Sequence, residues 1–120
     1  MDKKILLVDD AAFMRMMIKD TLTKNGYTSI AEAADGEQAV EQFKLEKPDL
    51  IIMDITMPNK TGIEALRDIK AIDSTAKIVM CSAMGQESMV VEAIKLGALD
   101  FIVKPFKPDR ILQTVSKIIG

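Results

Sequence analysis

The stretch ILLVDDAAFM, residues 5–14, decides how the chain folds. Four apolar residues run directly into two adjacent aspartates, Asp9 and Asp10, and a helical pattern of apolar residues begins straight after them. An uninterrupted apolar run is typical of a parallel strand that is covered on both faces. Two like charges at the end of a buried strand repel each other, so we expect a neighbouring group to compensate them.

The same alternation of apolar strand and helical segment recurs along the chain. The expected strands are KILLV (4–8), TSIAEA (28–33), DLIIMD (49–54), KIVMCSA (77–83) and DFIVK (100–104). Each is followed by a segment with helical spacing, which predicts an α/β fold: a doubly wound parallel five-stranded sheet, (βα)5, with helices on both faces. We expect a single domain over residues 1–120.

Ordinary capping residues mark the ends of the expected helices. The markers are Gly26 after the first helix, Asp35 before the second, Thr61 and Glu64 as a capping box, Gly97 after the fourth helix and Pro108 at the start of the fifth. In the first helix Met14, Ile18 and Leu22 recur at four-residue intervals and face the core. The methionines of FMRMM (13–17) are also expected to pack in the core, with a methionine-rich binding surface as the alternative.

Composition excludes several classes of protein. The net charge of −2 argues against a nucleic-acid partner, and no apolar run is long enough to span a membrane. The N-terminus lacks the features of a signal peptide, and the single cysteine, Cys81, is expected to be an inert core thiol, so a cytoplasmic protein is predicted. There is no histidine, so a histidine phosphoryl donor must lie on another protein.

Five polar residues follow or end strands of the predicted sheet: Asp9, Asp10, Asp54, Ser82 and Lys104. The carboxyl ends of parallel strands meet at one edge of a sheet, where ligands bind. Each residue alone has an ordinary interpretation, and Asp10 alone reads equally well as a helix N-cap. Together they indicate a functional site.

Three carboxylates about 5 Å apart repel each other by roughly 3 kcal/mol per pair at most. A hard cation such as Mg²⁺ relieves that repulsion and also accepts phosphate oxygens. A lysine and a hydroxyl nearby would bind the remaining oxygens, and a carboxylate beside them can attack phosphorus to form an aspartyl phosphate.

Four motifs, in this order, carry a resemblance to a known family: VDDAAFMRMMIKD, MDITMP with Gly62 after it, CSAMGQ and DFIVKPF. Over essentially its whole length the sequence resembles the receiver domain of bacterial response regulators, and within them the stand-alone chemotaxis type. The resemblance implies a flavodoxin-like fold with strand order 2-1-3-4-5.

The resemblance also implies which residues form the phosphorylation site. Asp54 is expected to be the phosphoacceptor, modified to 4-aspartylphosphate. Asp9 and Asp10 are expected to hold Mg²⁺ together with Asp54 and the backbone carbonyl of Thr56.

Further residues are implied to sense the phosphoryl group. Ser82 is the expected switch hydroxyl and Lys104 the lysine that contacts the phosphoryl group, with Asp54, Ser82 and Lys104 forming the catalytic set. The Lys104–Pro105 bond is expected to be cis. Phe101 is the expected aromatic switch residue, where family members often carry tyrosine.

The implied function is that of a chemotaxis response regulator. A chemotaxis histidine kinase would phosphorylate it, and the phosphorylated form would bind the flagellar motor switch protein; a dedicated phosphatase is a further expected partner. The protein would be a monomer that catalyses only its own phosphorylation and dephosphorylation. The alternatives are a stand-alone phosphorelay receiver and, from another class, a Mg²⁺-dependent phosphohydrolase with an aspartate nucleophile.

Overall fold

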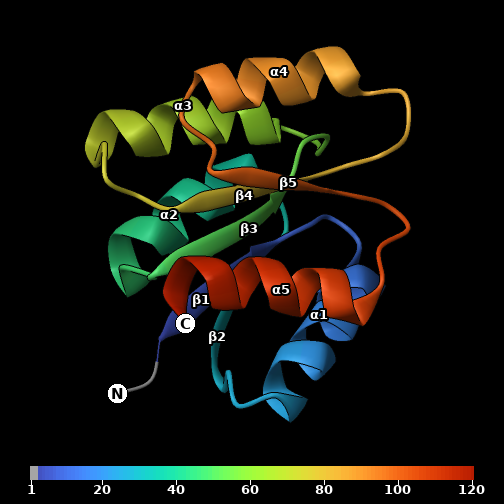
Figure 1. Ribbon diagram of the computed structural model, residues 1–120. Coiled ribbons are helices and arrows are strands. Elements are labelled where there is room, and N and C mark those ends of the chain that lie inside the picture. The colour runs from blue at the N-terminus through green and yellow to red at the C-terminus, as the bar shows by residue number, and fades with distance from the viewer. Residues whose placement is uncertain (1–2) are drawn as a thin grey trace.

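The computed structural model describes residues 3–120 as one parallel sheet with helices on both of its faces (Figure 1). The elements in chain order are β1 (Lys4–Val8), α1 (Ala12–Lys24), β2 (Ser29–Ala33), α2 (Gly36–Glu46), β3 (Leu50–Asp54), α3 (Gly62–Ile72), β4 (Ile78–Ser82), α4 (Glu87–Lys95), β5 (Asp100–Val103) and α5 (Pro108–Ile119). The five predicted strand–helix units are confirmed, and the strand ends differ from the predicted segments by no more than one residue.

The sheet has the order β2-β1-β3-β4-β5, with all neighbouring strands parallel, which confirms the order implied by the resemblance. The order reverses beside β1, because the chain passes from β1 to β2 on one side and then returns to β3 on the other. The loops that leave β1 and β3 therefore lead to helices on opposite faces, and the carboxyl ends of these two strands are where ligands bind in such sheets.

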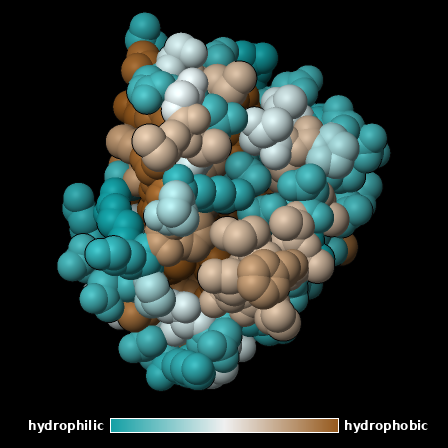
Figure 2. All heavy atoms as spheres, turned by 90° about the vertical axis from the view of Figure 1, so that its right-hand side faces the viewer, coloured by the Kyte–Doolittle hydropathy of each residue, from teal (hydrophilic) through white to brown (hydrophobic). Residues whose placement is uncertain are grey.

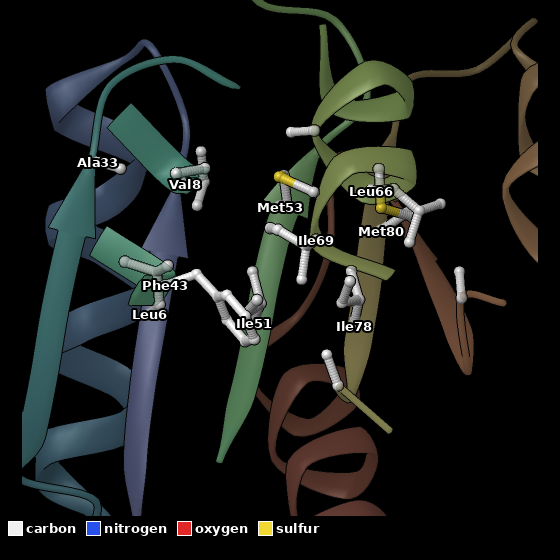
Figure 3. Close-up of a cluster of buried hydrophobic side chains, with 14 of the residues drawn as sticks. Leu6, Val8, Ala33, Phe43, Ile51, Met53, Leu66, Ile69, Ile78 and Met80 are labelled. Atoms are coloured by element: carbon white, nitrogen blue, oxygen red, sulfur yellow. The ribbon is translucent and has the colours of Figure 1, made fainter. Parts of the chain in front are cut away.

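Alternate residues of the central strands enter two separate cores, which explains why the strands are apolar along their whole length. Leu6 and Val8 of β1 face α2 and α3, with Phe43 and Leu66 packed against the same side of the sheet (Figure 3). On the opposite face lie α1 and α5, and the members of that core from β1 and these helices are Ile5, Leu7, Ile18, Leu22, Ile111 and Val115.

The predicted helix ends are also confirmed. The side chain of Asp35 accepts a hydrogen bond from the Gln38 N–H at 2.8 Å, and Thr61 and Glu64 form the reciprocal capping box of α3. Gly26 and Gly97 have φ angles of +94° and +112°, a left-handed conformation that glycine adopts without steric cost.

The prediction that the FMRMM segment packs in the core is wrong. Phe13 is 64% exposed, Met16 is 59% exposed and Met17 is 42% exposed, whereas Ile18 and Leu22 are buried. The reason is the helical period: the buried stripe of α1 runs through Ile18 and Leu22, and Met16 lies almost opposite Ile18 on the helix. Figure 2 shows the right-hand side of Figure 1, and a group of tan residues lies right of centre in its lower half, at the height where Figure 1 places α1.

Two further expectations concern burial and membranes. Cys81 is buried in β4, as predicted, and burial raises the pKa of its thiol to about 12, so it stays protonated and unreactive. Across residues 3–120, no helix combines the length and the apolar character that crossing a membrane requires.

Candidate functional site

The carboxyl ends of four strands bring the predicted polar residues together. Asp54 is the last residue of β3 and Ser82 is the last residue of β4, while Asp9 and Lys104 directly follow β1 and β5. The Lys104 N–H donates to the Ser82 carbonyl oxygen at 2.7 Å, which continues the pairing of β5 with β4 and fixes where the lysine side chain starts. The Lys104–Pro105 peptide bond is cis, as predicted.

Three carboxylates form an oxygen-only cluster at this edge. One carboxylate oxygen from each of Asp9, Asp10 and Asp54 lies within 4.8 Å of the other two. Asp9 and Asp54 are buried and Asp10 is exposed, so the cluster has two fixed ligand groups and one at the surface. Hard cations such as Mg²⁺ prefer oxygen ligands and retain several waters, so this donor set fits such an ion.

Lys104 compensates the charge of the two buried carboxylates, Asp9 and Asp54. Its Nζ donates to Asp54 Oδ2 at 2.9 Å and to Asp9 Oδ2 at 3.0 Å, so one ammonium group bridges two carboxylates. Burial raises the pKa of Asp54 above its ordinary value of 3.8, and the bonded lysine offsets only part of that rise. Burial by itself lowers the pKa of Lys104, but the hydrogen bonds to Asp54 and Asp9 outweigh it and the pKa is raised.

The loop after β1 is held by two contacts that involve Asp9. Asp9 Oδ1 accepts a hydrogen bond from the Ala11 N–H at 2.9 Å, and the Arg15 guanidinium donates to the Asp9 carbonyl oxygen at 2.5 Å. The N-cap of α1 is Ala11, without a side-chain cap, so the alternative reading of Asp10 as an N-cap is wrong. Arg15 lies within the VDDAAFMRMMIKD motif, but no pattern in the sequence predicted its contact with Asp9.

Gly62 explains part of the MDITMP motif. Its N–H donates to the Ile55 carbonyl oxygen at 2.8 Å, and a Cβ atom at this position would collide with the backbone oxygen of Asp54. A glycine therefore lets the N-terminus of α3 pack directly against the end of β3, which fixes the backbone that carries Asp54.

Ser82 and Phe101 border a groove between α4 and β5. This cavity of about 680 Å³ is lined by Ser82, Ala83, Met84, Glu87, Val90, Val91, Ile94, Lys95, Phe101 and Val103. Phe101 is partly exposed. The backbone oxygen of Phe101 accepts a hydrogen bond from Arg110 Nη2 at 2.8 Å. One cavity thus connects Ser82, at the end of β4, with the face of α4 that turns toward β5.

Gln86 is a second polar residue whose contacts no pattern in the sequence predicted. Its Oε1 accepts a hydrogen bond from the Ala83 N–H at 2.6 Å, and its Nε2 donates to Thr56 Oγ1 at 2.8 Å. One side chain therefore connects the loop after β4 with the loop after β3. The CSAMGQ motif contained Gln86, but only the tertiary structure shows what it contacts.

Comparison with known proteins gives consistent results for family and fold. The model of the response regulator receiver domain matches residues 5–116. The chain is 61% identical over 120 residues to the chemotaxis protein CheY of Bacillus subtilis (strain 168), covering 100% of both chains. It is 58% identical over 118 residues to the chemotaxis protein CheY of Thermotoga maritima, covering 98% of both chains.

A solved structure with the same fold is a complex that contains BeF3 and Mg²⁺. It is the CheX-CheY-BeF3-Mg²⁺ complex from Borrelia burgdorferi, which is similar to this chain with a TM-score of 0.91 and 36% identity. The match covers 98% of this chain and 90% of that one.

Proposed function

This chain belongs to the response regulator receiver domain family, and on that premise we propose that it is a chemotaxis response regulator phosphorylated on Asp54. The observation that carries the proposal is the pair of hydrogen bonds from Lys104 to Asp54 and Asp9, beside a cluster of three carboxylates. One edge of the sheet would then hold three things: a nucleophilic carboxylate, oxygen ligands for a metal ion, and a lysine cation that can bind phosphate oxygens.

The proposed reaction is transfer of a phosphoryl group from a phosphohistidine of a chemotaxis histidine kinase. A carboxylate oxygen of Asp54 attacks phosphorus, a P–O bond forms, and the P–N bond breaks with its electron pair returning to the histidine nitrogen. Lys104 then moves its hydrogen bond from the carboxylate to a phosphoryl oxygen, and it stays charged throughout because its pKa is raised.

Asp9, Asp10, Asp54 and the backbone carbonyl of Thr56 are the residues proposed to hold Mg²⁺. The bound ion would neutralise charge on the phosphoryl oxygens during transfer. The protein catalyses only its own phosphorylation and dephosphorylation in this scheme, so it is a phosphoprotein switch and not an enzyme with an external substrate.

The groove between α4 and β5 is the proposed route from the phosphoryl group to a partner. Ser82 would turn toward a phosphoryl oxygen, and the ring of Phe101 would move into the space beside it. The surface of α4, β5 and α5 would then bind the flagellar motor switch protein. A dedicated phosphatase is a further proposed partner, and the protein is proposed to act as a cytoplasmic monomer.

The two alternatives have less support. A phosphorelay receiver uses the same site, but both of the similar proteins described above are chemotaxis proteins. A phosphohydrolase is disfavoured because the chain matches the receiver family over residues 5–116.

Intact-mass measurement after incubation with acetyl phosphate tests the proposal. We expect one phosphoryl group to be added in the presence of Mg²⁺ and none in the presence of a chelator. Asp54→Asn should abolish the addition, whereas Asp49→Asn, at the other end of β3, should leave it intact. Undiminished incorporation in Asp54→Asn would contradict the assignment.

A further inference from the structure

Gln86 makes contacts that its position in the chain does not require. It is the N-cap residue of α4, yet its side chain makes no cap hydrogen bond to that helix. Glutamine is not among the preferred N-cap residues, and here the side chain turns backward instead. Gly85, with a φ angle of +90°, reverses the chain just before it.

The orientation of the Gln86 carboxamide follows from its partners. The Ala83 N–H can only donate, so the oxygen must face it, at 2.6 Å. The amide nitrogen then points to the Thr56 hydroxyl, at 2.8 Å, which accepts. Both ends of the carboxamide are therefore used, and the side chain is a tie between the β3–α3 and β4–α4 loops.

The tie occupies a backbone donor next to the phosphorylation site. Ala83 directly follows Ser82, whose carbonyl oxygen is already bonded to Lys104, so the first N–H after β4 is the one that Gln86 engages. A phosphoryl group on Asp54 brings anionic oxygens to this edge, and these are stronger acceptors than a carboxamide oxygen. If the β4–α4 loop moves toward Asp54 together with Ser82, the hydrogen bond from the Ala83 N–H to Gln86 must break.

We propose that Gln86 is a positioning residue that holds the β4–α4 loop in its resting arrangement and lowers the affinity of the site for a phosphoryl group. This inference rests on the proposed function, because it concerns regulation of the same site. The tie adds a contact that exists only in the resting state, so it biases the equilibrium between the two loop positions.

Binding of beryllofluoride at saturating Mg²⁺, followed by chemical-shift titration, measures this bias. Gln86→Met retains a side chain of similar length without either hydrogen bond. It should bind beryllofluoride roughly two- to tenfold more tightly than wild type, the range expected from the net contribution of one hydrogen bond. Its affinity for Mg²⁺ alone should stay the same, since the proposed ligands are intact. Hydrogen exchange of the Ala83 amide should become faster in the free protein.

Two further variants show whether the tie itself is responsible. Thr56→Val removes the other end of the tie and keeps the backbone carbonyl; it should tighten binding in the same direction, and the double variant should gain less than the two single effects combined. Gln38→Met is the matched control, because Gln38 Oε1 likewise accepts from a backbone N–H after a strand, that of Ala34 at 3.0 Å. It should leave the beryllofluoride affinity unchanged.

The results separate this inference from the proposed function. If wild type does not bind beryllofluoride with Mg²⁺, the proposed phosphorylation site is wrong and the tie has no role in it. If wild type binds it and Gln86→Met binds equally or more weakly, the regulatory role of Gln86 is wrong while the proposed function stands. An equal gain in Gln38→Met would also overturn the inference.

Discussion

Asp54 lies in an environment that opposes its own ionisation. It is buried at the end of β3, faces Asp9 and Asp10 across the cluster, and has Lys104 as its compensating charge. The raised pKa of Asp54 shows that burial outweighs the lysine. A charged carboxylate that is partly removed from water is a better nucleophile than a fully solvated one. The same burial of charge reduces the stability of the native state.

We predict that Asp54→Asn stabilises the metal-free protein at pH 7, by something on the order of 1 kcal/mol. The native pKa of Asp54 is above the unfolded value, so the native state binds more protons between these two values and its stability falls as the pH rises through that window. The stabilisation should therefore be complete above the native pKa and vanish below pH 3.8.

Urea titrations of wild type and Asp54→Asn at pH 7 and at a pH below 3.8 measure this difference in the free energy of unfolding. The control is Asp20→Asn, because Asp20 is exposed in α1 and, among residues 3–120, forms an ion pair only with Lys24, at 3.0 Å. It should change the free energy of unfolding by no more than about 0.5 kcal/mol. If Asp54→Asn is less stable than wild type at pH 7, the carboxylate has a structural role instead.

At the scale of elements, β4, α4 and β5 connect the acidic cluster to an outer surface. Ser82 ends β4 beside Asp54, and the groove that it lines continues to Phe101 on β5. Phe101 lies opposite Met80, two residues before the position in β5 that pairs with Ser82, so both side chains lie on the same face of the sheet. Val90 and Ile94 of α4 close the groove on that face. A shift in the loop after β4 therefore changes the surface that a partner meets.

We predict that Ser82→Ala still accepts a phosphoryl group on Asp54 but loses part of the gain in partner affinity. Phe101→Ala should weaken this coupling more than it weakens phosphorylation. Coupling free energies between two sites are typically about 1–3 kcal/mol, so we expect phosphorylation of wild type to raise its affinity for the partner by roughly five- to hundredfold. The measurement is the affinity for a motor-switch peptide with and without beryllofluoride and Mg²⁺. A full wild-type gain in both variants would show that the signal takes another route.

Across the whole molecule, the proposed metal site would couple metal binding to folding. Asp54 meets the adjacent pair Asp9 and Asp10 only in the native state, because it lies far from them along the chain, at the end of a different strand. An ion that binds only the folded form stabilises it by mass action.

We predict that Mg²⁺ raises the free energy of unfolding of wild type, by about 2.7 kcal/mol at a hundred times its dissociation constant. Asp54→Asn should gain much less, so that the stability difference between the two proteins narrows or reverses. Denaturant titrations at matched ionic strength, with NaCl in place of MgCl2, provide the control for screening. An equal gain with both salts would contradict a specific metal site.

The alternation of strands and helices, and the residues at the strand ends, could be read from the amino-acid sequence alone. Continuous apolar runs such as ILLV identify strands covered on both faces, and local caps such as Asp35 and Thr61 mark helix starts, because these signals depend on neighbours in the chain. The convergence of Asp9, Asp54 and Lys104 was predictable for a different reason: the parallel strands that carry them end at a common edge of the sheet.

Only the tertiary structure decided which contacts those residues make. The bridge from Lys104 to two carboxylates, the hydrogen bond from Arg15 to the Asp9 carbonyl and the tie from Gln86 to Thr56 join segments that lie on different loops or elements. The exposure of Met16 likewise depends on how α1 is rotated against the sheet. Such contacts depend on strand order and helix rotation, which the packing of the whole chain sets and which periodicity alone does not contain.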